Sequence, residues 1–259
     1  MSARFDNKVI IVTGAAQGIG HGVALALAAE GAKLLLVDRA DFLSDVVIET
    51  GLAESEIATV QADLETWAGA ELMLQAAINK FGRVDGLINN VGGTIWAKPY
   101  QYYQPEEIEA EIRRSLMPTL WCCRAVLPGM VAQQSGVIVN VSSIATKGIN
   151  RIPYSAAKGG VNALTASLAL EHASDGIRVN AVATGGTEAP QRKVPRNPKP
   201  LSSDEQVWYQ QIVDQTIDSS LMKRYGNIAD QVNAILFLAS EQAAYITGTV
   251  LPVGGGDQG

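Results

Sequence analysis

Val9-Ile10-Ile11-Val12-Thr13-Gly14-Ala15-Ala16-Gln17-Gly18-Ile19-Gly20 decides the fold of this chain. The run predicts an apolar strand, a glycine-rich turn with the spacing G-x-x-x-G-x-G, and the start of a helix. Glycines in such a turn let backbone N–H groups approach a phosphate at the positive end of the helix. A purely structural strand-to-helix turn is the alternative interpretation. The residues that we expect to contact the bound phosphates are Gly14, Gln17, Gly18, Ile19 and Gly20.

Apolar runs alternate with amphipathic stretches along the whole chain. This alternation predicts an α/β fold, a Rossmann-like doubly wound parallel sheet of seven strands with helices on both faces. We expect one domain over residues 1–259. The predicted strands are 8–13, 33–38, 57–62, 84–89, 136–142, 176–182 and 249–253, and the predicted helices are 18–30, 41–50, 65–81, 105–133, 152–174 and 227–240.

One segment, at about 184–222, interrupts the alternation. It begins with glycines and then carries four prolines between 190 and 200. Long insertions in compact domains are commonly functional loops. Because a helix and a strand are still expected after it, we interpret the segment as a substrate lid and not as a linker.

Composition excludes several classes of function. Hydrophobic residues make up 47% of the 259 residues, and the net charge of −6 argues against a nucleic-acid surface. No apolar run approaches the roughly 20 residues that a membrane span requires, and the polar N-terminus does not indicate a signal peptide. No cluster has metal-ligand spacing. The adjacent Cys122 and Cys123 are expected to be buried thiols in a reducing compartment, the cytoplasm.

Asp38 ends the second predicted strand. A carboxylate at this position can accept hydrogen bonds from the adenosine ribose and repels a ribose 2′-phosphate. The sequence therefore predicts NAD as cofactor over NADP. Arg39 follows directly and could soften that preference.

Tyr154 and Lys158 lie one helical turn apart, so their side chains share a face of the predicted helix. A phenol ordinarily keeps its proton until about pH 10, and a neighbouring ammonium favours the phenolate. The pair could therefore act as a general base near neutral pH. Tyr and Lys at this spacing also occur by chance on solvated helix faces, so the surrounding motifs decide between the two interpretations.

Those motifs, in their order along the chain, resemble the short-chain dehydrogenase/reductase family over the whole length. They are Thr13-Gly14-x-x-x-Gly18-x-Gly20, Asp63-Leu64, Asn89-Asn90-Val91-Gly92, Ser142-Ser143, Tyr154-x-x-x-Lys158 and Gly254-Gly255.

The resemblance implies a role for each matching residue. Ser143 would donate a hydrogen bond to the substrate oxygen, Tyr154 would take the hydroxyl proton, and Lys158 would lower the pKa of the phenol and bind the nicotinamide ribose. Ser115 stands where the family often has an Asn that anchors a water of a proton relay. The remaining cofactor contacts would be Asp63, Leu64, Asn90, Gly92, Gly185 and Thr187; Asn89 could simply tie strands together.

Three further segments, 89–99, 115–124 and 148–154, together with 185–190, resemble one branch of the family, the dehydrogenases of carboxylated aromatic cis-dihydrodiols. This likeness implies a small-molecule carboxylated cis-diol of the benzoate or p-cumate type as substrate, and a catechol as product. Arg151 is expected to bind the ring carboxylate, and Trp96 to form an apolar wall for the ring or to belong to the core. The lid adds Arg192, Lys193, Arg196 and Lys199, as an anion site or as a solvated loop.

Two other functions remain open on the sequence alone. One is a carbonyl reductase for oxoacyl or steroid ketones, against which Asp38 argues, and the other is a non-catalytic NAD-binding sensor. The resemblance implies a homotetramer assembled through 105–133 and 152–174. Because the same site residues would serve both acids, the sequence leaves open whether carbon dioxide is released.

Overall fold

A computed structural model describes residues 3–259. Seven parallel strands form one sheet in the order β3-β2-β1-β4-β5-β6-β9. The strand order reverses between β1 and β4, the point at which ligands bind at the carboxyl ends of doubly wound sheets. The fold prediction is therefore confirmed. The strands are β1 Val9–Thr13, β2 Lys33–Asp38, β3 Ile57–Gln61, β4 Gly86–Asn89, β5 Gly136–Ser143, β6 Ile177–Thr184 and β9 Val250–Val253.

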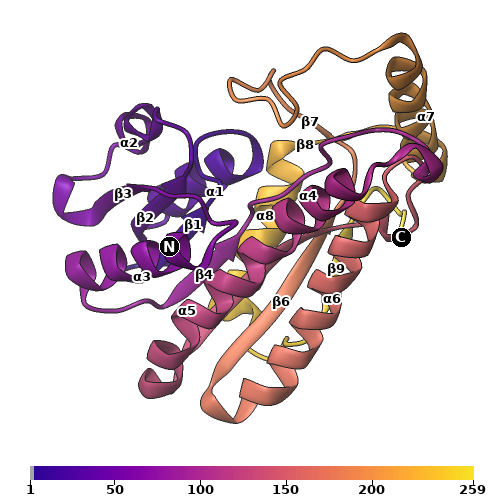
Figure 1. Cartoon of the computed structure of the whole chain (residues 1–259). Helices are drawn as coiled ribbons and strands as arrows, with labels where there is room; N and C mark the ends of the chain where they lie inside the picture. The colour runs from indigo at the N-terminus through magenta and orange to yellow at the C-terminus, as the bar shows by residue number, and fades with distance from the viewer. Residues whose placement is uncertain (1–2) are drawn as a thin grey trace.

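Helices cover both faces of this sheet (Figure 1). Helices α1, α2 and α8 pack on one face, and α3, α5 and α6 on the other. The helices are α1 Gly18–Ala29, α2 Leu43–Thr50, α3 Trp67–Phe81, α4 Pro105–Ser115, α5 Met117–Gln133, α6 Ile152–His172, α7 Ser203–Ser219 and α8 Ile228–Ala239, and short 3₁₀ turns lie at Glu54–Glu56, Tyr100–Tyr102, Ala145–Lys147, Ala173–Asp175 and Glu241–Ala243.

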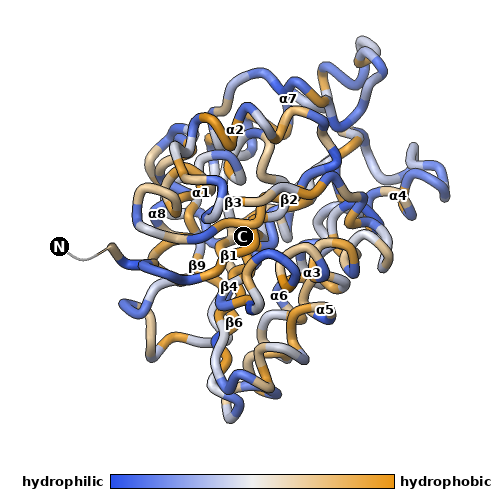
Figure 2. The backbone as a smooth tube through the Cα atoms, turned by 90° about the vertical axis from the view of Figure 1, so that its left-hand side faces the viewer, coloured by the Kyte–Doolittle hydropathy of each residue, from blue (hydrophilic) through white to orange (hydrophobic). Residues whose placement is uncertain are grey.

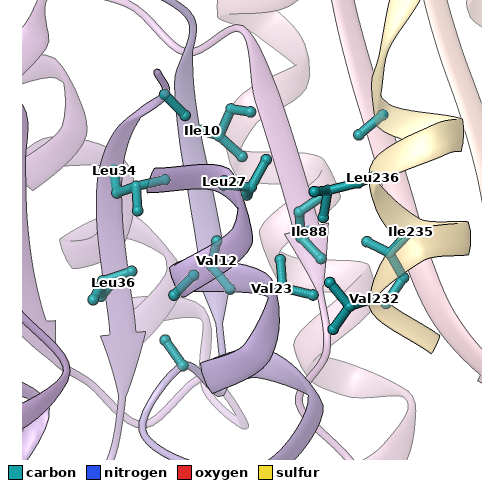
Figure 3. Packing of buried hydrophobic residues seen from close by; sticks show 14 of the residues in the cluster. Ile10, Val12, Val23, Leu27, Leu34, Leu36, Ile88, Val232, Ile235 and Leu236 are labelled. Carbon is teal, nitrogen blue, oxygen red and sulfur yellow. The ribbon is translucent and has the colours of Figure 1, made fainter. Parts of the chain in front are cut away.

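Successive residues of each strand belong to opposite layers of the core. Ile10 and Val12 pack under α1 and α8, whereas Ile11 between them packs under α3 and α5, because side chains alternate along a strand. Figure 3 shows the first layer, in which Val23 of α1 and Val232 of α8 meet the sheet. Figure 2 shows hydrophobic residues concentrated along the strands, while the peripheral loops are largely hydrophilic.

The predicted helix 105–133 is two helices, which meet at Leu116. The backbone of Leu116 departs from regular helix geometry with φ −119°, and Pro118 lies in the first turn of α5, where a missing N–H is tolerated. By length and composition alone, Pro105–Gln133 could cross a membrane, but half of its apolar window is buried. Since α5 packs on β4 and β5, this stretch has the properties of a core helix.

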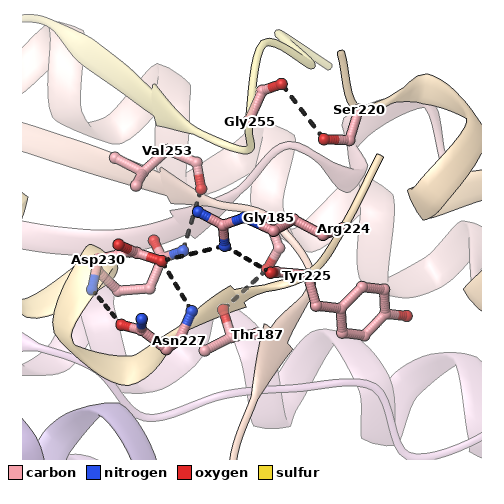
Figure 4. A network of polar contacts seen from close by, with 10 residues as sticks. Gly185, Thr187, Ser220, Arg224, Tyr225, Asn227, Asp230, Val253 and Gly255 are labelled. Carbon is pink, nitrogen blue, oxygen red and sulfur yellow. Dashed lines mark hydrogen bonds and ion pairs between the residues drawn. The ribbon is translucent and has the colours of Figure 1, made fainter. Parts of the chain in front are cut away.

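The segment 184–222 contains helix α7, which was not predicted from the sequence. Its start is fixed by a capping box, in which the Ser202 hydroxyl accepts from the Glu205 N–H and the Glu205 carboxylate accepts from the Ser202 N–H. Before α7, the short strand β7 (Thr187–Glu188) pairs with β8 (Gly226–Asn227). The paired strands β7 and β8 form the base of the lid, and Figure 4 shows the polar network around them. In this network the Asn227 side chain caps α8, and the Asp230 carboxylate accepts a hydrogen bond from the Asn227 N–H.

Candidate active site

A cleft opens at the carboxyl ends of the strands, beside β1 and β4, between which the strand order reverses. It runs from the end of β2 past the glycine-rich turn to α6, and residues of the segment 184–222, which was predicted to be a lid and is called the lid below, contribute to its lining. Its lining includes Gly14, Gln17, Ile19, Asp38, Asp63, Leu64, Asn90, Gly92, Gly93, Tyr154, Lys158, Arg192, Val194 and Arg196.

The glycine-rich turn is packed tightly against the first strand. A Cβ on Gly20 would lie 2.0 Å from the carbonyl oxygen of Gly14, so only glycine fits there. The Asp38 carboxylate closes the other side of the turn, because its Oδ2 accepts from the Ala16 N–H at 3.0 Å. The turn therefore presents the amino end of α1 and a fixed carboxylate to the same cleft.

Two asparagines that follow β4 have different tasks. Asn90 joins β4 to the glycine-rich turn, since its Nδ2 donates to the carbonyl oxygens of Thr13 and Gly14 at 3.2 and 3.1 Å. Asn89 is buried and donates to Asn140 Oδ1 of β5 at 2.9 Å. Asn89 thus ties two strands together, whereas Asn90 lines the cleft.

Tyr154 and Lys158 lie together on the buried face of α6. Lys158 is only 3% exposed, and its Nζ donates to the Val141 carbonyl at 2.6 Å. The ammonium nitrogen lies 5.9 Å from the centre of the Tyr154 ring. Burial lowers the pKa of Lys158 to about 7, with a smaller contribution from Arg196. The pair combines a phenol with a desolvated amine that changes charge near neutral pH.

The two serines at the end of β5 point to different partners. Ser142 Oγ donates to Asn162 Oδ1 of α6 at 2.5 Å. Ser143 Oγ accepts from the Ala145 N–H at 3.0 Å and donates to the Thr184 carbonyl at 3.4 Å. The second contact is long for an O–H donor, so the Ser143 hydroxyl can turn toward another acceptor.

Ser115 is fully buried beneath the loop that follows β4. Its Oγ accepts from the Gly93 N–H at 3.2 Å. A Cβ on Gly92 would lie 3.3 Å from Lys158 Nζ and 3.7 Å from Ser115 Oγ. The Ser115 hydroxyl and the Lys158 ammonium therefore flank the same glycine.

The lid contacts the glycine-rich turn through Gln17. The Gln17 side chain donates to the Val194 carbonyl at 3.2 Å and accepts from the Val194 N–H at 3.5 Å. Arg192 lies above the turn, where a Cβ on Gly18 would be 3.9 Å from its terminal nitrogen. Arg196 lies deeper, among Tyr154 and charged groups of α4. Gln17 was expected to contact cofactor, and in this structure its amide also fastens the lid.

Eight predicted site residues are not among the residues that line the cleft, namely Gly18, Gly20, Ser115 and Ser143, described above, and the four that follow. Gly185 and Thr187 belong to the base of the lid, where the Thr187 hydroxyl donates to the Gly185 carbonyl at 3.1 Å. Trp96 packs beside Lys98, whose Nζ lies 5.9 Å from the indole centre. Arg151 lines a separate hollow with Gly148, Gln215 and Asp257.

Glu111 is a buried carboxylate close to the cleft residue Arg196, and the sequence did not predict a role for it. It is fully buried, and its Oε1 accepts from the N–H groups of Ile95 and Trp96 at 2.8 and 2.9 Å. Burial raises its pKa to about 7. Because Glu111 precedes Ser115 by one helical turn, the same face of α4 carries both, a spacing that the sequence already contains.

This arrangement fits a nicotinamide dinucleotide. The turn at the amino end of α1 suits a pyrophosphate, Asp38 suits ribose hydroxyls, and Tyr154 with Lys158 lies at the far end of the same cleft. That end contains a proton acceptor, and the strand end beside it carries two hydroxyls, of which Ser142 lines the cleft and Ser143 is not among the lining residues. A phenol, an amine and a hydroxyl are a set that suits oxidation of an alcohol or reduction of a ketone. Between residues 3 and 259, no group of three or more His, Cys, Asp or Glu side chains could hold a metal ion.

Comparison with known proteins is consistent with this chemistry. The family model described as short chain dehydrogenase matches residues 8–199. A 1,6-dihydroxycyclohexa-2,4-diene-1-carboxylate dehydrogenase from Acinetobacter baylyi is 66% identical over 99% of this chain and 98% of its own. One of the same description from Pseudomonas putida is 61% identical over 100% and 96%.

More distant proteins share the fold and the length. A 2,3-dihydroxy-2,3-dihydro-p-cumate dehydrogenase from Pseudomonas putida is 33% identical over 97% of this chain and 94% of its own. The crystal structure of 3-ketoacyl-(acyl-carrier-protein) reductase from Brucella melitensis complexed with NADH superposes with a TM-score of 0.84, at 30% identity over 98% of this chain and 99% of that one.

Proposed function

Since this chain belongs to the short-chain dehydrogenase family, we propose that it oxidises the ring-carboxylated cis-dihydrodiol of benzoate, with NAD, to catechol and carbon dioxide. The observation that carries the proposal is the full-length identity of 66% to a dehydrogenase of this diol acid. The p-cumate type is less favoured, because identity to that relative is half as high, 33%. The buried Tyr154–Lys158 pair supplies the base that the oxidation requires.

The reacting carbon follows from the structure of the substrate. In the benzoate diol, the carbon that bears the carboxylate has no hydrogen, so only its carbinol neighbour can lose hydride. Bound NAD would accept that hydride. Oxidation leaves a β-keto acid, which loses its carboxylate as carbon dioxide and passes the bond's electron pair into the ring. The resulting enolate takes a proton and becomes the aromatic catechol.

The residues of the chain would manage the protons. Tyr154 would take the hydroxyl proton as hydride leaves, and Lys158 would stabilise the phenolate. Ser143, whose hydrogen bond to Thr184 is long, would turn to hold the substrate oxygen. Ser115 would complete the outer relay from beside Gly92, without the amide of the family's usual Asn.

Cofactor choice is part of the proposal. Asp38 is fixed by two backbone donors, the Ala16 N–H at its Oδ2 and the Ala40 N–H at its Oδ1, both at 3.0 Å. A carboxylate held this rigidly would bind ribose hydroxyls and repel the additional phosphate of NADP. This supports NAD. Thr187 would reach the nicotinamide carboxamide only after the base of the lid rearranges.

The test is direct. Purified protein is incubated with NAD or NADP and the diol acid of benzoate or of p-cumate. In a separate assay it is incubated with NADH or NADPH and a simple keto ester. We expect NADH, catechol and carbon dioxide in equal amounts from the benzoate diol with NAD. Retention of the carboxylate would assign the p-cumate type, and turnover of the keto ester alone would replace the proposal with a carbonyl reductase.

We further propose a homotetramer in the cytoplasm. An apolar groove between α5 and α6, lined by Leu120, Leu127, Leu164 and Leu168, supports assembly through these helices. Both cysteines are buried free thiols, which suits a reducing compartment. Sedimentation analysis of the purified protein would give the number of subunits.

A further inference from the structure

Two arginines near Tyr154 lack partners for buried donors. Among residues 3–259, the Nε atoms of Arg151 and Arg196 are both buried without a hydrogen-bond partner. Both guanidinium groups lie close enough to Tyr154 and Tyr209 to interact electrostatically. Burying an unpaired cationic donor costs free energy, so an anionic ligand would relieve an existing penalty.

Arg196 occupies a slot that only a glycine leaves open. A Cβ on Gly93 would lie 2.1 Å from its Nε and 2.2 Å from its Cζ. The Gly93 backbone has φ +126°, which other residues rarely adopt, and Ser115 holds its N–H. The loop after β4 is therefore shaped around the guanidinium group.

The lid also holds Arg196 in place. Val194, two residues earlier, is fastened to Gln17 by hydrogen bonds in both directions. The groups around the guanidinium include two further cations, Lys158 and Arg114. Glu111 is the opposing carboxylate, yet its Oε2 has no hydrogen-bond partner either. Within the described residues, the Arg196 Nε therefore has no hydrogen-bond partner, while Lys158 and Arg114 are two further cations near its guanidinium group.

The positions of the arginines separate their tasks. Arg192 lies above the glycine-rich turn, where a pyrophosphate would bind. Arg151 lines the hollow that also contains Asp257, a carboxylate near enough to act on it. Arg192 and Arg196 both line the cleft, but of the three arginines it is Arg196 that lies against Gly93 and acts electrostatically on Lys158.

We propose that Arg196, and not Arg151, binds the ring carboxylate of the substrate. This inference rests on the proposed function and names the residue that selects for the acid. A guanidinium forms two parallel hydrogen bonds with a carboxylate. Because Arg196 is part of the lid, the carboxylate would also hold the lid closed over the carbon that loses hydride.

The experiment compares a charged and an uncharged diol. The variants are Arg196→Gln, Arg196→Lys, Arg151→Gln and, as a matched control, Lys199→Gln, which removes an exposed cation of the same lid. Each is assayed with the benzoate diol acid and with the cis-dihydrodiol of benzene, which lacks the carboxylate. Thermal unfolding of each variant shows that it folds.

We expect Arg196→Gln to lower kcat/KM for the diol acid by about 10- to 100-fold, mainly through KM, the range for a lost charged hydrogen bond. Activity on benzene diol should change less than about threefold, since no charged contact is lost there. Arg196→Lys should recover part of the loss, and Lys199→Gln should behave as wild type. If Arg196→Gln lowers kcat/KM equally for both diols, Arg196 has only a structural role. If only Arg151→Gln lowers kcat/KM selectively for the diol acid, Arg151 binds the ring carboxylate instead.

Failure of the proposed function would be visible separately. If wild-type protein oxidises neither diol, the reaction is wrong, and calorimetric titration with benzoate in the presence of NADH still tests Arg196. Weaker benzoate binding by Arg196→Gln, with NADH binding unchanged, would support the anion site. Equal binding by wild type and variant would overturn it.

Discussion

The ammonium nitrogen of Lys158 lies 5.9 Å from the centre of the Tyr154 ring, in a position that is almost completely closed to solvent. Burial disfavours the charged form of the amine and lowers its pKa to about 7. Lys158, which is proposed to activate Tyr154 as the general base, therefore destabilises the folded protein while its amine is charged.

Lys158→Met should stabilise the cofactor-free protein while abolishing turnover. The folded-state pKa of Lys158 lies below its unfolded value, so the native state carries the full penalty below about pH 7 and none above about pH 10.5. The melting temperature of the variant should exceed that of wild type by several degrees near pH 6, and this gain should shrink toward pH 10. A gain that is independent of pH would assign the effect to packing.

Tyr154→Phe should remove activity without removing cofactor. Loss of a general base lowers rates by about 10²- to 10⁴-fold, whereas the cleft keeps its lining and should bind NADH with unchanged affinity. Initial-rate assays measure the activity, and fluorescence titration with NADH measures the affinity for the cofactor. The matched control is Tyr245→Phe, because Tyr245 is fully exposed. If Tyr154→Phe abolishes turnover but the variant still performs the protein's role in the cell, the protein acts as a non-catalytic NAD-binding sensor.

The strands were predictable because the sheet is covered on both faces. Lys33–Asp38 was predicted to the residue, since a twice-buried strand is an uninterrupted apolar run. The break at Leu116 was not predicted, although the charged Arg113-Arg114-Ser115 gives way there to an apolar run in which Pro118 soon follows. Helix α7 was not predicted because several prolines precede it, although Ser202 and Glu205 have the spacing of a capping box.

The site was predictable only where a local motif defines it. The chain order places Gly14, Asp38 and Asn90 at the carboxyl ends of parallel strands and Tyr154 in the first turn of the helix that follows β5, so their meeting follows from topology. The pairing of Gln17 with Val194 spans 177 positions. Such a contact depends on how the lid folds back, and no local pattern encodes it.

Asp38→Asn should reduce discrimination between NAD and NADP. The amide keeps an acceptor for one backbone N–H but loses the charge that repels a 2′-phosphate, and Arg39 and Arg192 lie on the same cleft. We expect the ratio of kcat/KM values for the two cofactors to fall by about tenfold or more, the effect of roughly 1.4 kcal/mol. Asp41→Asn, at an exposed neighbouring position, is the control. An unchanged ratio would remove Asp38 from cofactor selection.

Glu111→Gln should stabilise the protein at alkaline pH. The folded-state pKa of Glu111 is raised from 4.5 to about 7 by burial, so the native state favours the protonated acid. The stability that this acid contributes is complete below about pH 4.5 and is lost as the pH rises through about 7.

A shift of this size corresponds to about 3 kcal/mol at about 1.4 kcal/mol per pKa unit. Glutamine keeps the acceptor for Ile95 and Trp96 but cannot ionise, so its advantage should appear between about pH 5 and pH 8. Chemical denaturation at several pH values measures it, with Glu106→Gln of the exposed first turn of α4 as control. If wild type and Glu111→Gln lose stability in parallel across this range, the arginines around the carboxylate hold it ionised, and Arg196 then already has its counter-ion in the protein.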